Sequence, residues 1–164
     1  MSKTRSLLLA LLLLVIPSVP LFAQGRSALI NEVVRSVRNA NPKWHFVAGF
    51  CTCPGLVRSQ TAYAFGVMYH RKISDHRHVA IYIAYVPTVA LAADWFRDLR
   101  DRNAANGWQQ DEYKFADEAY LCWASDPRGA SLYFRRKAAI VQISGSRTDV
   151  QFVAHTLLNE WAAR

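Results

Sequence analysis

Two stretches of the chain, residues 61–69 and 78–86, alternate bulky side chains with small ones at every second position. A period of two is that of a β-strand, in which successive side chains point to opposite faces of a sheet. The polar segment between the two stretches is short enough to form a hairpin tip. The chain is therefore constrained to contain an antiparallel hairpin. Each of its strands has one bulky face and one face of mostly small residues, which suits a sheet that is covered on one side and only partly open on the other.

Three other segments have the period of an amphipathic helix. The first is residues 27–39. The second follows Thr88, a predicted N-cap, and Asn106-Gly107 ends it. The third starts at the capping box Thr148-Asp149-Val150-Gln151. Further strands are expected at residues 44–53, at residues 119–124, and in a second hairpin of residues 130–134 and 139–144. Short turns between strands predict the α+β class, with a single antiparallel sheet packed by N-terminal, middle and C-terminal helices.

The first 23 residues have the pattern of a secretory signal peptide. Lys3 and Arg5 precede the apolar run of residues 7–16, and Leu21-Phe22-Ala23 offers a cleavage site after Ala23. The run is about half the roughly 20 residues that a membrane-spanning helix needs. We therefore expect a periplasmic or secreted protein of residues 24–164, with one domain and no permanent membrane span.

Removal of Lys3 and Arg5 with the signal lowers the formal net charge from +8 to +6. This positive excess indicates either anionic surroundings or a solvated basic surface.

Three cysteines remain after removal of the signal: Cys51, Cys53 and Cys122. An oxidising compartment allows one disulfide among them. A bridge from Cys51 or Cys53 to Cys122 is favoured, because it closes a loop of about 70 residues and stabilises by ~4 kcal/mol in the chain-entropy model.

Basic residues gather at both expected hairpin tips. Arg71, Lys72 and Arg77 belong to the first tip, and Arg135-Arg136-Lys137 forms the second. If the fold brings the tips together, they form an anion-binding edge. If it does not, they are two independent solvated turns.

The sheet face offers a second candidate binding surface, through Tyr63, Tyr82 and Tyr85. An anionic envelope component or a protein partner is the expected ligand. Nucleic acid is not expected, because the chain has neither a recognition-helix motif nor an aromatic stacking signature. No cofactor motif is present, and the leading hypothesis is a non-catalytic binding or accessory protein.

Two short segments resemble the nucleophile and base segments of NlpC-type cell-wall peptidases. They are Cys53-Pro54-Gly55-Leu56-Val57 and His78-Val79-Ala80-Ile81-Tyr82-Ile83. The resemblance implies a thiol hydrolase with Cys53 as the thiolate and His78 as the base. Cys53 and His78 are 25 residues apart, which is closer than in that family, and Pro54 stands where the family has Ser. The hydrolase is the alternative function.

Metal binding is a further alternative at the first hairpin tip. His70, His76 and His78 supply imidazoles and Asp75 a supporting carboxylate, whereas the neighbouring cations of the tip would repel a metal ion. The sequence Cys51-Thr52-Cys53, with His45 nearby along the chain, offers soft ligands for an ion such as Cu(I).

Three stretches resemble small secreted bacterial domains of PsbP-like architecture. They are Ala92-Ala93-Asp94-Trp95-Phe96, Asp117-Glu118-Ala119-Tyr120-Leu121, and the hairpin from Ser131 to Ser144. The resemblance implies an antiparallel sheet flanked by helices, in a binding or accessory module. It brings no functional residue. Such sequences usually have Gly-Asn in the second hairpin turn, where this chain has Lys137-Ala138.

Overall fold

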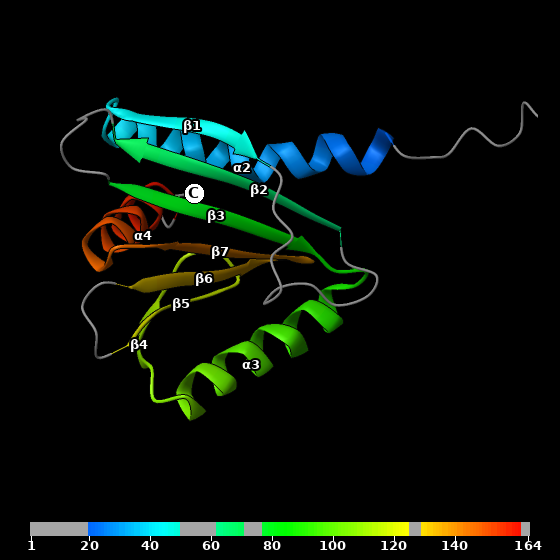
Figure 1. The fold of residues 1–164 in the computed structure, drawn as a ribbon. Helices are drawn as coiled ribbons and strands as arrows, with labels where there is room; N and C mark the ends of the chain where they lie inside the picture. The colour runs from blue at the N-terminus through cyan, green and yellow to red at the C-terminus, as the bar shows by residue number, and fades with distance from the viewer. Residues whose placement is uncertain (1–19, 50–61, 71–76, 125–128, 162–164) are drawn as a thin grey trace, which may run out of the picture.

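The computed structural model describes residues 20–49, 62–70, 77–124 and 129–161, and Figure 1 shows their arrangement. In chain order the elements are α2 (Pro20–Ala40), β1 (Trp44–Gly49), β2 (Ala62–His70), β3 (His78–Tyr85), α3 (Val89–Ala105), β4 (Gln109–Tyr113), β5 (Glu118–Trp123), β6 (Ala130–Arg136), β7 (Ala139–Gly145) and α4 (Arg147–Trp161).

The described strands form one seven-stranded sheet in the order β1-β2-β3-β7-β6-β5-β4. Every neighbouring pair is antiparallel. The two hairpins lie side by side, because β3 pairs with β7 in the middle of the sheet. This architecture confirms the predicted α+β class.

One face of the sheet, which we call the two-helix face, is packed by α2 and α4 (Figure 1). The larger core lies here, built from alternate residues of the central strands and the apolar stripes of both helices. Trp161 of α4 donates its indole N–H to Ser36 of α2 at 3.2 Å and thereby links the two helices. Fully buried members of this core include Val33, Trp44, Ile81, Leu132, Phe134, Ile143 and Leu157.

The opposite face, the one-helix face, carries α3 as its only described helix. Its smaller core joins the helix to β5, β6 and β7. Ala92, Trp95, Phe96 and Leu99 are the buried residues of α3, as the helical period predicts. Because α3 packs over one part of this face, the part formed by β1 and β2 has no described helix on it.

Two N-terminal caps were predicted from the sequence, and the structure confirms one of them. Thr88 caps α3 by accepting the N–H of Leu91 at 3.1 Å, as predicted. The capping box predicted from Thr148 is wrong: α4 starts one residue earlier, and Ser146 is the residue that accepts the Asp149 N–H, at 3.2 Å. On the exposed face of α3, Arg97 forms an ion pair with Asp94.

A two-residue turn, Lys137-Ala138, joins β6 to β7, because Arg136 pairs directly with Ala139. Lys137 has a φ of 54°. This is the left-handed region, which is unfavourable for residues with a Cβ and favours glycine. The turn is held in place by Asp117, whose Oδ2 accepts the Lys137 N–H at 2.5 Å.

We expect Lys137→Gly to raise the free energy of unfolding by about 0.5–1 kcal/mol, because it removes this backbone strain. Ala138→Gly is the matched control, since Ala138 is not among the residues with positive φ. That change should lower stability by a similar amount through added freedom of the unfolded chain. Urea denaturation measures both, and effects of the same sign would contradict the argument.

Among the described residues, no helix combines the length and apolar character needed to cross a membrane.

Candidate binding surface

The strand ends that flank the two basic hairpin tips lie at opposite ends of β3 and β7. The first tip begins after His70 and returns at Arg77, beside the end of β7, because Val79 pairs with Gly145. The second tip lies beside the other end of β3, where the Val86 N–H bonds to the Ala138 carbonyl at 2.8 Å. The seven-residue span of β3 between them corresponds to about 23 Å. Among the described residues, the fold therefore does not bring Arg77 next to the second tip.

Arg77, one of the predicted anion-binding residues, is bound to a carboxylate of the protein itself. Its Nε donates to Asp149 Oδ1 at 2.7 Å, and its Nη2 lies 2.5 Å from the same oxygen. Ser146 donates to the other carboxylate oxygen at 2.8 Å. The guanidinium also lies 5.7 Å from the centre of the Trp44 ring. Arg77 thus ties the first hairpin to the N-terminus of α4.

Arginines of the second tip have internal partners as well. Arg135 is buried, and its guanidinium donates to Glu118 at 3.0 Å and to Asp117 at 3.1 Å. Arg136 donates to Glu32 of α2 at 2.6 Å and lies 5.1 Å from the Trp161 ring. Lys137 is exposed in the turn, and Arg71 and Lys72 lie outside the described residues.

The predicted tyrosines do not share one face. Tyr85 packs against the larger core on the two-helix face, whereas Tyr82 packs against the smaller core on the one-helix face. Tyr63 lies opposite Ala84 in the ladder, and its side chain is outside the described part. Tyr82 and Tyr85 are three positions apart in the same strand, so their side chains point to opposite faces of the sheet.

For the thiol and metal hypotheses the structure describes only some of the residues. Cys51, Cys53, Asp75 and His76 lie outside the described ranges. His78 is exposed at the start of β3, and residues 62–70 form strand β2. Within the described ranges, no three His, Cys, Asp or Glu side chains gather in a way that could hold a metal ion.

Cys122 is a buried free thiol on β5. It lies in the smaller core, where the Asn103 amide is 3.2 Å from the Tyr120 hydroxyl and 3.7 Å from the Cys122 sulfur. The expected bridge to Cys122 is not formed. A physical reason is the separation of the strands. β1, the strand that precedes Cys51 in the chain, lies five strand positions from β5, or about 24 Å. A disulfide joins Cα atoms that lie within about 7 Å of each other.

Burial raises the pKa of Cys122 to about 12. We therefore expect iodoacetamide to label it negligibly in the folded protein at pH 8 and fully after unfolding, as peptide mass spectrometry would report. The folded state holds this proton more tightly than the unfolded state, whose thiol has an ordinary pKa near 9.0. Stability should thus fall as the pH rises from about 9 toward 12. Rapid labelling of the folded protein would contradict the burial.

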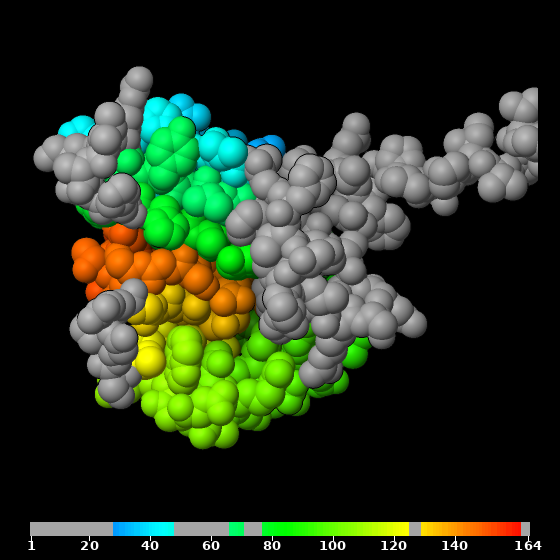
Figure 2. Space-filling view, viewed as in Figure 1, coloured from blue at the N-terminus to red at the C-terminus, as the bar shows by residue number. Residues whose placement is uncertain are grey.

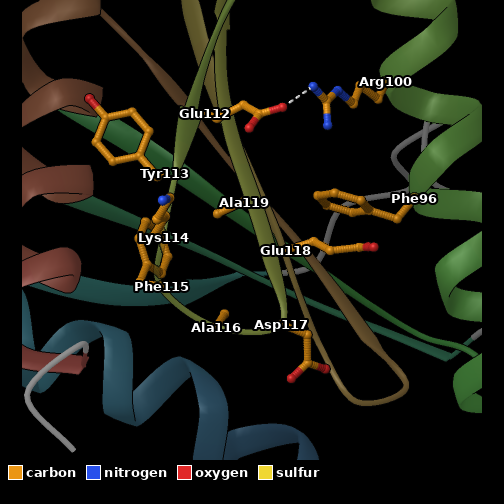
Figure 3. A pocket seen from close by; sticks show the side chains of 10 residues that line it. All are labelled: Phe96, Arg100, Glu112, Tyr113, Lys114, Phe115, Ala116, Asp117, Glu118 and Ala119. Atoms are coloured by element: carbon orange, nitrogen blue, oxygen red, sulfur yellow. Dashed lines mark hydrogen bonds and ion pairs between the residues drawn. The ribbon is translucent and has the colours of Figure 1, made fainter.

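A cleft of about 390 Å³ lies between α3 and the β4–β5 hairpin (Figure 3). Arg100 of α3 and Glu112 of β4 form an ion pair in its wall. Asp117 and Glu118 also line it, and both are bound by Arg135. The pairs hold α3 and the hairpin in place, and we assign them a structural role.

The uncovered part of the one-helix face combines rings and aliphatic side chains at the surface. We call it the open patch: His45, Val47, Val67, Tyr69, His78 and Ala80 from β1, β2 and β3. Val47 is 53% exposed and Tyr69 is 43% exposed, although both are large and apolar. His45 stacks on Tyr69 with ring centres 5.6 Å apart. Figure 2 shows these strands at the surface, in cyan and green.

Sequence reasoning predicted a partly open sheet face and chose Tyr63, Tyr82 and Tyr85 to represent it. The open patch contains none of these three tyrosines, and its exposed apolar side chains, Val47 and Tyr69, lie on β1 and β2. The alternation of His45 and Val47 with buried Trp44 is the signal that could have identified it.

Comparison of the chain with known protein families, characterised proteins and solved structures finds no match.

Proposed function

We propose that this chain is an exported, non-catalytic protein of the cell envelope that binds its partner on the open patch. The observation that carries the proposal is the exposure of Val47 and Tyr69 on a sheet face that α3 leaves uncovered. Exposed apolar side chains grouped on one surface are typical of interaction sites. The N-terminal basic and apolar segment supports export, and the resemblance to PsbP-like domains supports a binding role.

The chemistry of the described residues also favours binding over catalysis. The carboxylates of the cleft are paired with arginines. The one described thiol is buried, and its raised pKa keeps it protonated. No observation in the described ranges favours the thiol hydrolase over the binding protein.

Site-specific photocrosslinking in cells that export the protein tests the proposal. A benzoylphenylalanine at position 47 or 69 should give a discrete covalent adduct, whereas one at exposed Asp111 of β4 should not. The adduct at position 69 should be lost when Val47→Asp is added and kept when Val89→Asp is added. Val89 is the matched control because it is 52% exposed and lies on α3. Equal adducts at all three positions, or none at 47 and 69, would overturn the proposal.

A further inference from the structure

The two edges of the sheet are chemically different. β4 forms one edge, and it carries Asp111 and Glu112. Charged side chains on an edge strand discourage pairing with another chain. β1 forms the other edge with the sequence Trp-His-Phe-Val-Ala-Gly, which holds no proline and no formally charged residue. Only the β1 edge is therefore chemically suited to accept an additional strand.

The edge strand β1 is firmly held by the sheet and by α4. Trp44 is fully buried and stacks on Phe152 of α4, with ring centres 6.2 Å apart. The Phe46 ring covers Gly66 of β2 so closely that a Cβ at Gly66 would lie 2.1 Å from it. An aromatic ring over a strand glycine fixes the register of a pair. A partner would therefore meet a preformed template.

Backbone groups of β1 point outward from the sheet at every second residue. His70 donates its N–H to the Arg77 carbonyl at 2.9 Å, so His70 faces β3. Tyr69, one residue earlier, therefore turns its N–H and C=O toward β1, where it lies opposite His45. The same alternation in β1 turns the N–H and C=O of Phe46 toward the free edge.

Next to this edge lies a basic flank formed by α2 and by the segment that joins α2 to β1. Arg35, Arg38 and Lys43 are exposed, and none of them forms an ion pair within the described part of the chain. Arg35 and Arg38 line a groove of about 380 Å³ that also includes Asn31, Val34 and Pro42.

The groove lies on the flank of α2 that faces away from α4. Ser36 contacts α4 through Trp161, and Arg38 is two residues later, which is about 200° farther around the helix. Since α2 packs over β1, β2 and β3, its flank away from α4 faces the β1 edge. A strand added about 4.8 Å beyond β1 would lie on the side where these arginines are.

We propose that β1 accepts an extended, acidic peptide segment of the partner protein, which adds an eighth strand to the sheet while its carboxylates pair with Arg35, Arg38 and Lys43. The inference deepens the proposed function and rests on it for the existence of a partner. Main-chain hydrogen bonds to the outward groups of β1 provide binding free energy, and the basic flank selects for negative charge. A second copy of this chain is a poorer occupant, because it would bring the same three cations to the edge.

The test uses two capped octapeptides as probes, one alternating valine with aspartate and one alternating valine with lysine. The aspartate probe should bind the purified protein and slow amide hydrogen exchange at Phe46 at least tenfold, as measured by NMR. The lysine probe should do neither. Binding should weaken steeply between 50 and 500 mM salt, because exposed charges are screened.

Two double variants that change the net charge equally, one beside the β1 edge and one away from it, show where the aspartate probe binds. Arg35→Glu with Arg38→Glu should weaken binding of the aspartate probe at least tenfold. Arg97→Glu with Lys114→Glu changes the net charge by the same amount away from the β1 edge and should leave the affinity within twofold. Circular dichroism confirms that both double variants fold.

Three results would overturn the inference. The first is binding of the aspartate probe without protection of Phe46, which would indicate anion binding alone. The second is equal weakening by both double variants. The third is protection of Phe46 that grows with protein concentration without any probe, which would indicate self-pairing. Photocrosslinks at positions 47 and 69 would persist in the first two cases, so failure of this inference is distinguishable from failure of the proposed function.

Discussion

Replacing Gly145 with alanine is expected to lower the free energy of unfolding by about 2–3 kcal/mol, the upper part of the roughly 1–3 kcal/mol that forced overpacking costs. A Cβ at Gly145 would lie 2.7 Å from the backbone carbonyl oxygen of His78 and 3.0 Å from a methyl group of Val79. A backbone atom cannot rotate away as a side chain can. β3 and β7 would have to separate locally, in the centre of the sheet, where the two hairpins are joined.

Gly129→Ala is the matched control, because a Cβ at Gly129 has nothing within 4 Å. It should change stability by less than about 0.5 kcal/mol, as exposed substitutions usually do. Urea denaturation of both variants measures the difference. Equal stability of the two variants would show that β3 and β7 are not in contact at Gly145.

Removing the charge of Arg77 with Arg77→Met is expected to cost about 2 kcal/mol of stability. Asp149 is only 2% exposed, so its carboxylate would be left buried with Ser146 as its remaining side-chain partner. Loss of one member of a fully buried pair costs roughly 3–5 kcal/mol, and the value here is reduced because Arg77 is 37% exposed. The same pair joins the first hairpin to α4, across 72 positions of the chain.

A double-mutant cycle with Asp149→Asn separates the ion pair from its surroundings. The two single changes should together lower stability by more than the double variant does, since the double variant leaves no unpaired charge. A parallel cycle at the exposed pair Arg97 and Asp94 should show coupling below about 0.5 kcal/mol. Additive effects at Arg77 and Asp149 would contradict the pairing.

Local periodicity was sufficient to predict most of the elements. The alternation in β2 and β3 and the apolar stripe of α3 are properties of neighbouring residues, and the structure has the strands and the helix at these places. Strand β4 was missed because Gln109, Gln110, Asp111 and Glu112 have no apolar alternation. An edge strand with exposed polar residues buries too little surface to show one.

The candidate site was less predictable because it depends on contacts between distant parts of the chain. Arg77 and Arg136 look like free cations in the sequence, but their acidic partners are 72 and 104 positions away. The separation of the two basic tips follows from the antiparallel pairing of β3 with β7. The role proposed for Arg35 and Arg38 depends on β1 being the uncharged edge of the sheet, which follows from the strand order and not from the local sequence around the arginines.

The claim that this chain acts by binding in the envelope, and not by thiol chemistry, is tested most directly by intact-mass and alkylation analysis of the protein recovered from an oxidising compartment. We expect the mass of a chain that starts at Gln24, with Cys122 labelled only after unfolding and no cysteine labelled rapidly near neutral pH. An unprocessed chain that stays in the cytoplasm would contradict the proposed export. Rapid alkylation of Cys53 near neutral pH would contradict the binding role and favour the thiol hydrolase.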